Sequence, residues 1–263
     1  MADTNIGDGE LRSTNEPRTG VISGRTFMIK TVQYSDIDGD AIFEGDIVLG
    51  TTAQMEEAFK KISESDDVQE ALKGIFISGS KFRWPNGVIP FRIDPGLPDP
   101  NRVTEAIQHW HNHTAIRFVP RTQEADFVTF RRSPNGCSSA VGRQTNEQFI
   151  NLGDGCTKGN VIHEIGHTVG LWHEQSREDR KDFIEIDFTN VIPGKEHNFN
   201  QHIQDGDDVG GYDYGSIMHY SAFAFAIDQT KPTIITPNGE KIGQRDGLSD
   251  GDVAAVKAVY GFA

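Results

Sequence analysis

The string His163-Glu164-Ile165-Gly166-His167 constrains this chain more than any other feature, and it lies in residues 158–171, which have a helical pattern. Two histidines four residues apart lie one above the other on a helix face, so both imidazoles can reach a single zinc ion. His173 follows His163 by ten residues, and on a straight helix it would lie about 15 Å further along the axis. The chain must therefore turn before His173, and we expect Gly170 to end the helix in the left-handed conformation.

Glu164 directly follows the first histidine and points about 100° away from it around the helix axis. From there its carboxylate can reach a water molecule on the metal without displacing it. Three neutral imidazoles leave zinc its full charge and an open position, and zinc then lowers the pKa of a bound water toward about 7. We therefore assign His163, His167 and His173 to one zinc ion per chain, and Glu164 to general base and acid catalysis of peptide hydrolysis.

The same string has two less specific interpretations. A lone H-E-x-x-H can arise by chance on an amphipathic helix, but glycine at the eighth position and histidine at the eleventh reduce that chance to the order of one in a million for this length. A structural zinc site usually has a fourth protein ligand, often cysteine. Here a glutamate lies beside the histidines instead, so the catalytic interpretation is favoured.

The remaining histidines do not form a second metal motif. His109, His111 and His113 alternate along a segment of helical periodicity and therefore point in different directions, so we expect solvated or capping roles. His197, His202 and His219 have no ligand spacing to one another, and we expect structural roles for them.

Two separated motifs resemble one protease family. The run from His163 to His173 is similar to the zinc signature of the metzincins, and its continuation, Glu174-Gln175-Ser176-Arg177 with Asp179-Arg180, resembles the astacin family in particular. About 45 residues further on, Ser216-Ile217-Met218-His219-Tyr220 resembles the Met-turn of that family. The similarity covers roughly residues 82–262, including Arg83-Trp84-Pro85-Asn86-Gly87-Val88-Ile89-Pro90 and Leu248-Ser249-Asp250.

This resemblance implies a zinc endopeptidase acting on protein or peptide substrates. The implied fold is an α+β metzincin fold of two subdomains with a cleft between them. A twisted N-terminal sheet with the zinc-binding helix forms one, and an irregular C-terminal subdomain with the Met-turn and a terminal helix forms the other. Met218 would form an apolar floor beneath the histidines. Tyr220 would stabilise the oxyanion and ligate zinc in the resting mature enzyme, and Glu174 would anchor the mature N-terminus through a buried ion pair.

A short motif upstream completes the resemblance. Phe43-Glu44-Gly45-Asp46 is similar to the F-x-G-D motif of astacin prosegments. By this resemblance the Asp46 carboxylate would bind zinc in the latent form and replace the catalytic water. A carboxylate is a good zinc ligand, and Gly45 allows the backbone to approach a narrow cleft.

The distribution of residue types divides the chain near Gly74. All nine histidines, all three tryptophans and both cysteines lie beyond it. We expect residues 1–74 to be an inhibitory prosegment, with about the first 25 residues disordered because they are rich in small polar residues. Residues 75–263 would be the catalytic domain, and an activating protease would cut between Lys73 and Ile75.

Charge and cysteine content limit the partners and the compartment. The net charge of −14 disfavours nucleic acid and anionic lipid surfaces, and the longest apolar runs are too short to cross a bilayer. By the family resemblance Cys137 and Cys156 would form a disulfide, contributing about 3 kcal/mol and indicating an oxidising compartment. Residues 1–10 are polar and acidic, so we expect a secreted monomer whose signal peptide has been removed.

Hydrophobic periodicity gives the expected elements of an α+β fold. It predicts helices over residues 52–72, 101–111, 158–171 and 249–260 and strands over residues 25–32, 88–93, 116–119, 127–131 and 149–152. Residues 35–46 have the composition of turns.

Two rival functions remain open. A non-catalytic zinc-binding or adhesion protein could retain the metal site on the same scaffold, although the presence of Glu164 and Tyr220 disfavours this alternative. A metzincin of another subfamily would lack the F-x-G-D motif and the pairing of Glu174.

Overall fold

A computed structural model describes residues 15–22, 30–64, 82–201 and 208–262 of the chain. The expected cleavage segment between Lys73 and Ile75 lies outside these residues, as do His202 and the first 14 residues. Among the helices of the described residues, none is long and apolar enough to cross a membrane.

A nine-stranded mixed sheet runs through the molecule in the order β1-β2-β3-β4-β8-β9-β7-β5-β6. Parallel pairing joins β5 to β6 and β7, β7 to β9, and β4 to β8, whereas β8 and β9 are antiparallel. A separate two-stranded ladder pairs β10 with β11. The strands are β1 (Arg18–Ile22), β2 (Lys30–Ile37), β3 (Asp40–Phe43), β4 (Ile47–Thr51), β5 (Val88–Ile93), β6 (Arg117–Pro120), β7 (Phe127–Arg132), β8 (Cys137–Ser139), β9 (Glu147–Leu152), β10 (Glu185–Ile186) and β11 (Ile234–Ile235).

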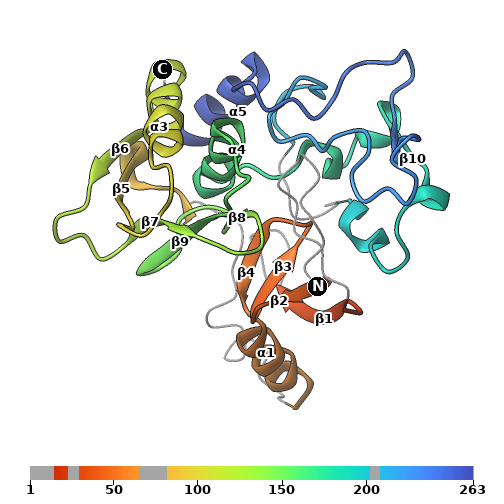
Figure 1. The fold of residues 1–263 in the computed structure, drawn as a ribbon, viewed down its shortest axis with the longest axis horizontal. Helices are drawn as coiled ribbons and strands as arrows, with labels where there is room; N and C mark the ends of the chain where they lie inside the picture. Colours follow the sequence, from red (N-terminus) through yellow and green to blue (C-terminus); the bar gives the residue numbers. More distant parts are fainter. Residues whose placement is uncertain (1–14, 23–29, 65–81, 202–207, 263) are drawn as a thin grey trace.

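Four α-helices accompany the strands in the described residues: α1 (Thr52–Glu64), α3 (Asn101–His113), α4 (Lys158–Val169) and α5 (Asp250–Tyr260). Figure 1 shows α4 between the strands β5–β9 and a loop-rich region that contains β10. Helices α3 and α4 share one apolar core with the sheet, in which Trp110 and Ile162 pack with Phe130. Residues 82–201 and 208–262, which we call the main unit, therefore match the expected arrangement of a sheet region and an irregular region around a central helix.

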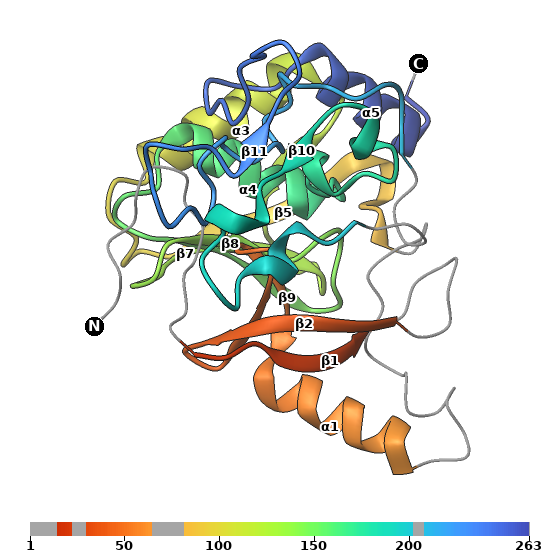
Figure 2. The ribbon, with the colours of Figure 1, turned by 90° about the vertical axis from the view of Figure 1, so that its right-hand side faces the viewer.

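Residues 15–22 and 30–64, which we call the front unit, form most of a second apolar core, to which Val141 of the main unit also contributes. Strands β1 to β4 form an antiparallel meander, and α1 packs against it through Met55, which is buried with Tyr34 and Val32. In Figure 2, α1 lies beyond β1 and β2 on the side away from α4. The front unit joins the main sheet where Ile47 of β4 pairs with Ser139 of β8.

Two expectations for the front unit were wrong. Residues 18–22 form β1 although we expected disorder up to about residue 25, because Val21 and Ile22 are buried against the rest of the meander. Residues 35–46 are largely strand rather than turns: β2 and β3 meet at Asp38-Gly39, which have φ of +52° and +88°. A two-residue connection with positive φ at both positions is the turn that best matches the twist of a hairpin.

The other expected elements occur with shifted ends. The helices predicted from residues 101, 158 and 249 correspond to α3, α4 and α5, and α1 begins at Thr52 as expected. The predicted extension of α1 to residue 72 lies outside the described residues. So does residue 25, the expected start of the strand predicted over residues 25–32. Strand β8 was missed, because three residues carry too little periodicity to be recognised.

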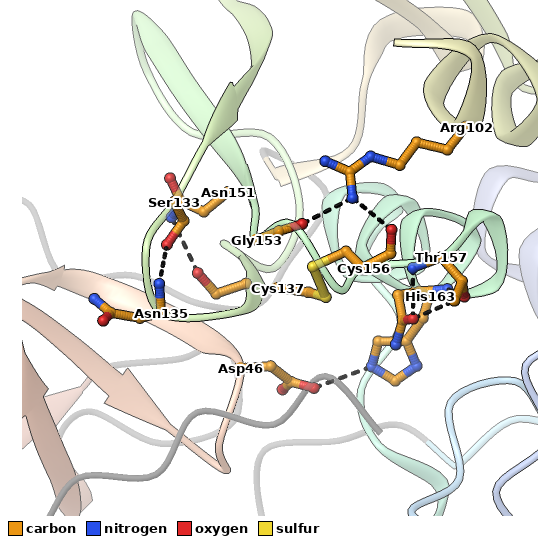
Figure 3. The surroundings of a disulfide bond; sticks show 12 residues. Asp46, Arg102, Ser133, Asn135, Cys137, Asn151, Gly153, Cys156, Thr157 and His163 are labelled. Atoms are coloured by element: carbon orange, nitrogen blue, oxygen red, sulfur yellow. Dashed lines mark hydrogen bonds and ion pairs between the residues drawn. A yellow bond between two sulfur atoms is a disulfide. The ribbon is translucent and has the colours of Figure 1, made fainter. Parts of the chain in front are cut away.

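The expected disulfide is present between Cys137 and Cys156. Figure 3 shows that it links β8 to the loop that leads into α4. The buried Arg102 of α3 donates to the carbonyl oxygens of Gly153 and Cys156 in the same loop. These contacts fix the start of α4 relative to the sheet and so help to place the residues that follow along this helix.

Candidate metal centre

Helix α4 has well-defined ends that set the direction of its side chains. At its start, Thr157 and Asn160 form a capping box, each side chain accepting from the other's backbone N–H. At its end, Gly170 has φ of +118°, and its N–H donates to the carbonyl oxygens of Gly166 and His167. The predicted left-handed end of the helix is therefore confirmed, and the chain turns back so that His173 faces the same point as the two helical histidines.

Four buried side chains converge beside α4. A nitrogen from each of His163, His167 and His173 and a carboxylate oxygen of Asp46 all lie within 4.8 Å of one another. The Nε2 atoms of His163 and His173 are each 3.2 Å from an Asp46 oxygen, and that of His167 is 3.5 Å away. Ligands about 2.0–2.1 Å from a tetrahedral zinc are separated by about 3.3–3.4 Å, close to the three distances between the histidines and Asp46.

The outer nitrogens of the three imidazoles are already engaged. Nδ1 of His163 donates to the carbonyl oxygen of Ile217 over 2.7 Å, and Nδ1 of His167 donates to that of Leu171 over 2.9 Å. Nδ1 of His173 donates to Oε2 of Glu44 over 2.9 Å. Donation from Nδ1 leaves the Nε2 lone pairs free to bind a metal, as in metal sites whose histidines are oriented by outer acceptors.

Two inner atoms of the group, Nε2 of His167 and Oδ1 of Asp46, are buried without a hydrogen-bond partner. Unpartnered buried polar atoms are costly unless a cation satisfies them. Burial alone would raise the pKa of Asp46, but the charge of His173 and the closeness of the other two imidazoles hold it well below its usual range. The donor set of three imidazoles and one carboxylate therefore fits one zinc ion.

Asp46 is held in this position by the backbone that precedes β4. Its carbonyl oxygen accepts from the N–H of Ser139 at the edge of β8 over 2.9 Å. The two residues before it, Glu44 and Gly45, have φ of +44° and +74°. This left-handed turn brings the Asp46 carboxylate toward His163 (Figure 3), and a residue without a side chain at position 45 adopts it without strain.

Glu164 is buried beside the group, and its Oε2 atom has no hydrogen-bond partner. Burial and the negative charge of Asp46 both raise its pKa well above the usual range, whereas the nearby Arg245 opposes the shift. A carboxyl group with a raised pKa and an unused oxygen is suited to accept and return a proton.

The Met-turn lies directly beneath α4. Met218 is buried, and its sulfur lies 2.5 Å from the point where a Cβ on Gly166 would be, so no side chain fits at that position of the helix. Tyr220 is also buried, and its ring lies 4.7 Å from that of His173 between centroids. The Tyr220 hydroxyl donates to the carbonyl oxygen of Glu44 over 2.6 Å, so it faces the front unit rather than the group of four.

Glu174 lies in a small cavity of about 100 Å³ between the zinc-signature segment and α5, together with Arg177, Asp208 and Val259. Its Oε1 atom accepts from the N–H of Asp213 over 2.8 Å. Burial raises the pKa of Glu174 to about 7. The Nε atom of Arg177 lies 3.6 Å from the same oxygen, but Arg177 also pairs with Asp179, so Glu174 shares its cationic partner with a second acid.

Four of the remaining described histidines have structural contacts, as expected for His219, whereas we expected solvated or capping roles for His109, His111 and His113. Nε2 of His109 accepts from the N–H of Leu248, and Nε2 of His111 accepts from that of Phe118. His113 contacts the carbonyl oxygen of His109, and His219 contacts the Tyr212 hydroxyl.

Three residues around the group were not predicted from the sequence. Glu44 occupies the variable position of the F-x-G-D motif, so its charge was the only available signal. Arg245 donates to the carbonyl oxygens of Ile217 and His219, and Asp252 accepts from the N–H of Ile217. Both support the Met-turn from distant parts of the sequence, and no local pattern identifies them.

Comparison with known proteins agrees with this geometry. The family model described as "Astacin", a peptidase family, matches residues 76–261. Bone morphogenetic protein 1 of Xenopus laevis is 40% identical over 188 residues, covering 67% of this chain and 27% of that protein. Zinc metalloproteinase nas-30 of Caenorhabditis elegans is 35% identical over 266 residues, covering 98% of this chain and 34% of that protein.

Among solved structures, high choriolytic enzyme 1, a hatching enzyme zinc-protease from Oryzias latipes, matches with a TM-score of 0.65 and 34% identity. The match covers 70% of this chain and 96% of that chain. The chain spans about a third or less of the length of the two relatives named above.

Proposed function

The chain belongs to the astacin family, and we propose that it is a zinc-dependent endopeptidase that hydrolyses peptide bonds in protein substrates and is folded here as a latent precursor. The observation that carries the proposal is the buried group of Asp46 with three histidines whose outer nitrogens are already bonded. His163, His167 and His173 would hold the zinc ion, and Asp46 would be the fourth ligand of the latent form.

The chemistry divides between the metal and the side chains around it. A bound zinc ion acts as a Lewis acid and lowers the pKa of a coordinated water toward about 7. Glu164, with one oxygen unbonded, would take a proton from the attacking water and deliver it to the leaving amine. Tyr220 would donate from its hydroxyl to the developing oxyanion once its present acceptor, the Glu44 carbonyl, has left.

The position of the front unit supports latency. An Asp46 carboxylate oxygen lies close to the Nε2 atoms of the three histidines, as a fourth ligand would, and Glu44 engages both His173 and Tyr220. We infer that residues 1–74 are the inhibitory prosegment and residues 75–263 the catalytic domain, with activating cleavage between Lys73 and Ile75. The family match, which begins at residue 76, supports this boundary.

The cavity beside Glu174 supports a role in maturation. A new N-terminal amine is a cation that could pair with this buried carboxylate, and such a pair would hold the Glu174 pKa down rather than near 7. The Cys137–Cys156 disulfide supports secretion into an oxidising compartment. We propose a secreted monomer that acts on protein substrates and requires an activating protease.

The test compares three forms of the chain on a quenched fluorescent peptide, each with its bound zinc quantified. The forms are the intact chain, a chain trimmed to begin near Ile75, and the trimmed chain with Glu164→Ala. We expect cleavage by the trimmed chain alone, at least about 100-fold faster than by its Glu164→Ala variant, with about one zinc ion retained in every form.

Other outcomes would each reject a defined part of the proposal. Zinc bound at one per chain without cleavage by any form would favour the non-catalytic zinc-binding protein. Equal cleavage by the intact and trimmed chains would reject latency but retain the peptidase.

A further inference from the structure

Glu44 is a buried acidic residue with three contacts to the main unit. It has no exposed surface. One carboxylate oxygen accepts from Nδ1 of His173 over 2.9 Å, and the other accepts from the hydroxyl of Ser176 over 2.8 Å. Its carbonyl oxygen accepts from the Tyr220 hydroxyl over 2.6 Å. A single residue of the front unit therefore engages both a metal-site histidine and the adjacent tyrosine.

The three histidines of the group differ in where their outer partner comes from. His163 and His167 donate to carbonyl oxygens of Ile217 and Leu171, which are backbone atoms of the main unit. The outer partner of His173 is the side chain of Glu44, in the front unit. Removal of the front unit would leave the first two contacts intact and remove the third.

The nature of this partner matters for metal binding. A carboxylate on the outer nitrogen of a metal-binding histidine fixes the ring orientation and tautomer and raises the basicity of the inner nitrogen. A carbonyl oxygen also fixes the ring orientation and tautomer, but because it carries only a partial charge it raises the basicity of the inner nitrogen less. His173 also differs from the other two because it lies beyond the end of α4, where the helix backbone no longer fixes the direction of its side chain.

We propose that Glu44 is a positioning residue that orients His173, so that the precursor holds its zinc ion more tightly than Asp46 alone would ensure. Metal loading would then be favoured before the front unit is removed. This inference relies on the proposed function only for the assumption that the group binds zinc.

The test measures the zinc affinity of the intact chain by competition with a chelator. We expect the dissociation constant to rise about 10- to 100-fold in Glu44→Ala, which is the usual effect of losing such an outer partner, and by a smaller factor in Glu44→Gln. The matched control is Asp38→Gly. Asp38 also contacts the main unit, through Asn135, but touches no metal-site residue, and glycine suits its φ of +52°. The zinc affinity of the Asp38→Gly variant should equal that of the unchanged chain.

A second comparison separates Glu44 from Asp46, because loosening the front unit could act through the loss of Asp46. Asp46→Ala would release the front unit as a whole, so Glu44 is tested in the closed chain through the environment of each histidine. Proton NMR of the zinc-loaded chain should show the Nδ1 proton of His173 shifted by Glu44→Gln, whereas the Nδ1 protons of His163 and His167 keep their positions.

Each result has one meaning. If Glu44→Gln leaves the Nδ1 proton of His173 unmoved, or leaves the zinc affinity of the intact chain equal to that of Asp38→Gly, Glu44 does not position the metal and the inference is wrong. If the unchanged chain binds no zinc, the proposed function itself fails.

Discussion

The front unit and the main unit belong to one sheet, but they are held together in different ways. Within the main unit, α3 and α4 share a large apolar core with the sheet, and a disulfide links β8 to the start of α4. The front unit has a separate, smaller core around Met55 and Tyr34. Between the two, the sheet continues through the pairing of Ile47 with Ser139.

Several of the contacts between the units lie at the metal centre. Asp46 and Glu44 supply buried carboxylates, and Phe43 packs edge-on against Trp172 beside them. Buried charged pairs contribute little net stability but are costly to break on one side only. The front unit is therefore attached both by apolar packing against Val141 and Trp172 and by carboxylates that contact the candidate metal centre.

The strongest test of this contrast is Asp46→Ala in the intact chain. Removing one member of a buried charge pair costs about 3–5 kcal/mol, so the equilibrium between closed and open forms should shift about 150- to 5,000-fold. We expect the uncut chain to cleave peptide correspondingly faster. This is measured as the initial rate, before the chain itself has been cut. An unchanged rate would mean that contacts other than Asp46 hold the front unit in place.

Tyr220→Phe tests the residue that bonds to Glu44 in the intact chain and would stabilise the oxyanion in the trimmed chain. In the trimmed chain we expect kcat to fall about 100-fold with little change in KM, because a donor to the oxyanion is removed. In the intact chain the same change removes one hydrogen bond to Glu44, which should weaken attachment by only about 1 kcal/mol. Steady-state kinetics of the trimmed form and protease resistance of the intact form measure the two effects. A change in KM with kcat unaltered would contradict the assigned role.

Met55→Ala should disturb the front unit alone. Met55 is 1% exposed beneath the meander, and truncation of such a side chain costs about 2–5 kcal/mol. We expect the front unit to unfold at lower denaturant concentration while the trimmed chain, which lacks residue 55, is unaffected by definition. Hydrogen–deuterium exchange at increasing urea concentration, read on peptides of each unit, would follow the two units separately. A single transition shifted for all signals would show that the two units do not unfold separately.

The smallest expected effect concerns acid stability of the main unit. Burial lowers the pKa of His111, and Arg117 adds to the shift. The unfolded state therefore binds a proton more readily than the folded state, and stability falls as the pH drops below about 6.5. In His111→Gln the amide oxygen can still accept from Phe118 but does not titrate.

When the pH is lowered from about 7.5 to about 5.5, the melting temperature of the trimmed chain should fall. This decrease should be smaller in the trimmed His111→Gln variant than in the unchanged trimmed chain. Thermal unfolding at both pH values measures this difference. His109→Gln serves as a comparison, since His109 also accepts from a backbone N–H and also has a lowered pKa. Identical losses in all three proteins would show that these histidines do not govern acid stability.

The sequence predicted those parts of the site that depend on short spacings. The turn of an α-helix determines that His163 and His167 share a face, and Gly170 marks the end of the same helix, so these positions could be derived locally. Asp46 was found because its motif resembles that of a family. Each of these residues has its chemistry and its position encoded within a few neighbouring residues.

The remaining features depend on contacts between distant segments. Strand β1 forms because Val21 and Ile22 find apolar partners in β2 and α1, which composition alone does not show. The hairpin at Asp38-Gly39 did have a local signal, a dipeptide typical of tight hairpin turns, that was outweighed by the surrounding polar residues. Glu44 and Arg245 act on residues more than 25 positions away in sequence, so no pattern along the chain indicates their roles.

The hydrogen bond from the Ser139 N–H to the carbonyl oxygen of Asp46 would protect a latent precursor from self-cleavage. A peptide bond is cut only if its carbonyl group faces the nucleophile and the oxyanion donors. At Asp46 the side chain faces the three histidines, while the carbonyl oxygen is bound to β8. If the chain is a latent precursor, its metal centre would therefore meet the Asp46 carboxylate and not the peptide bond that follows it. Self-digestion at this point would require the front unit first to dissociate and then to return in another orientation.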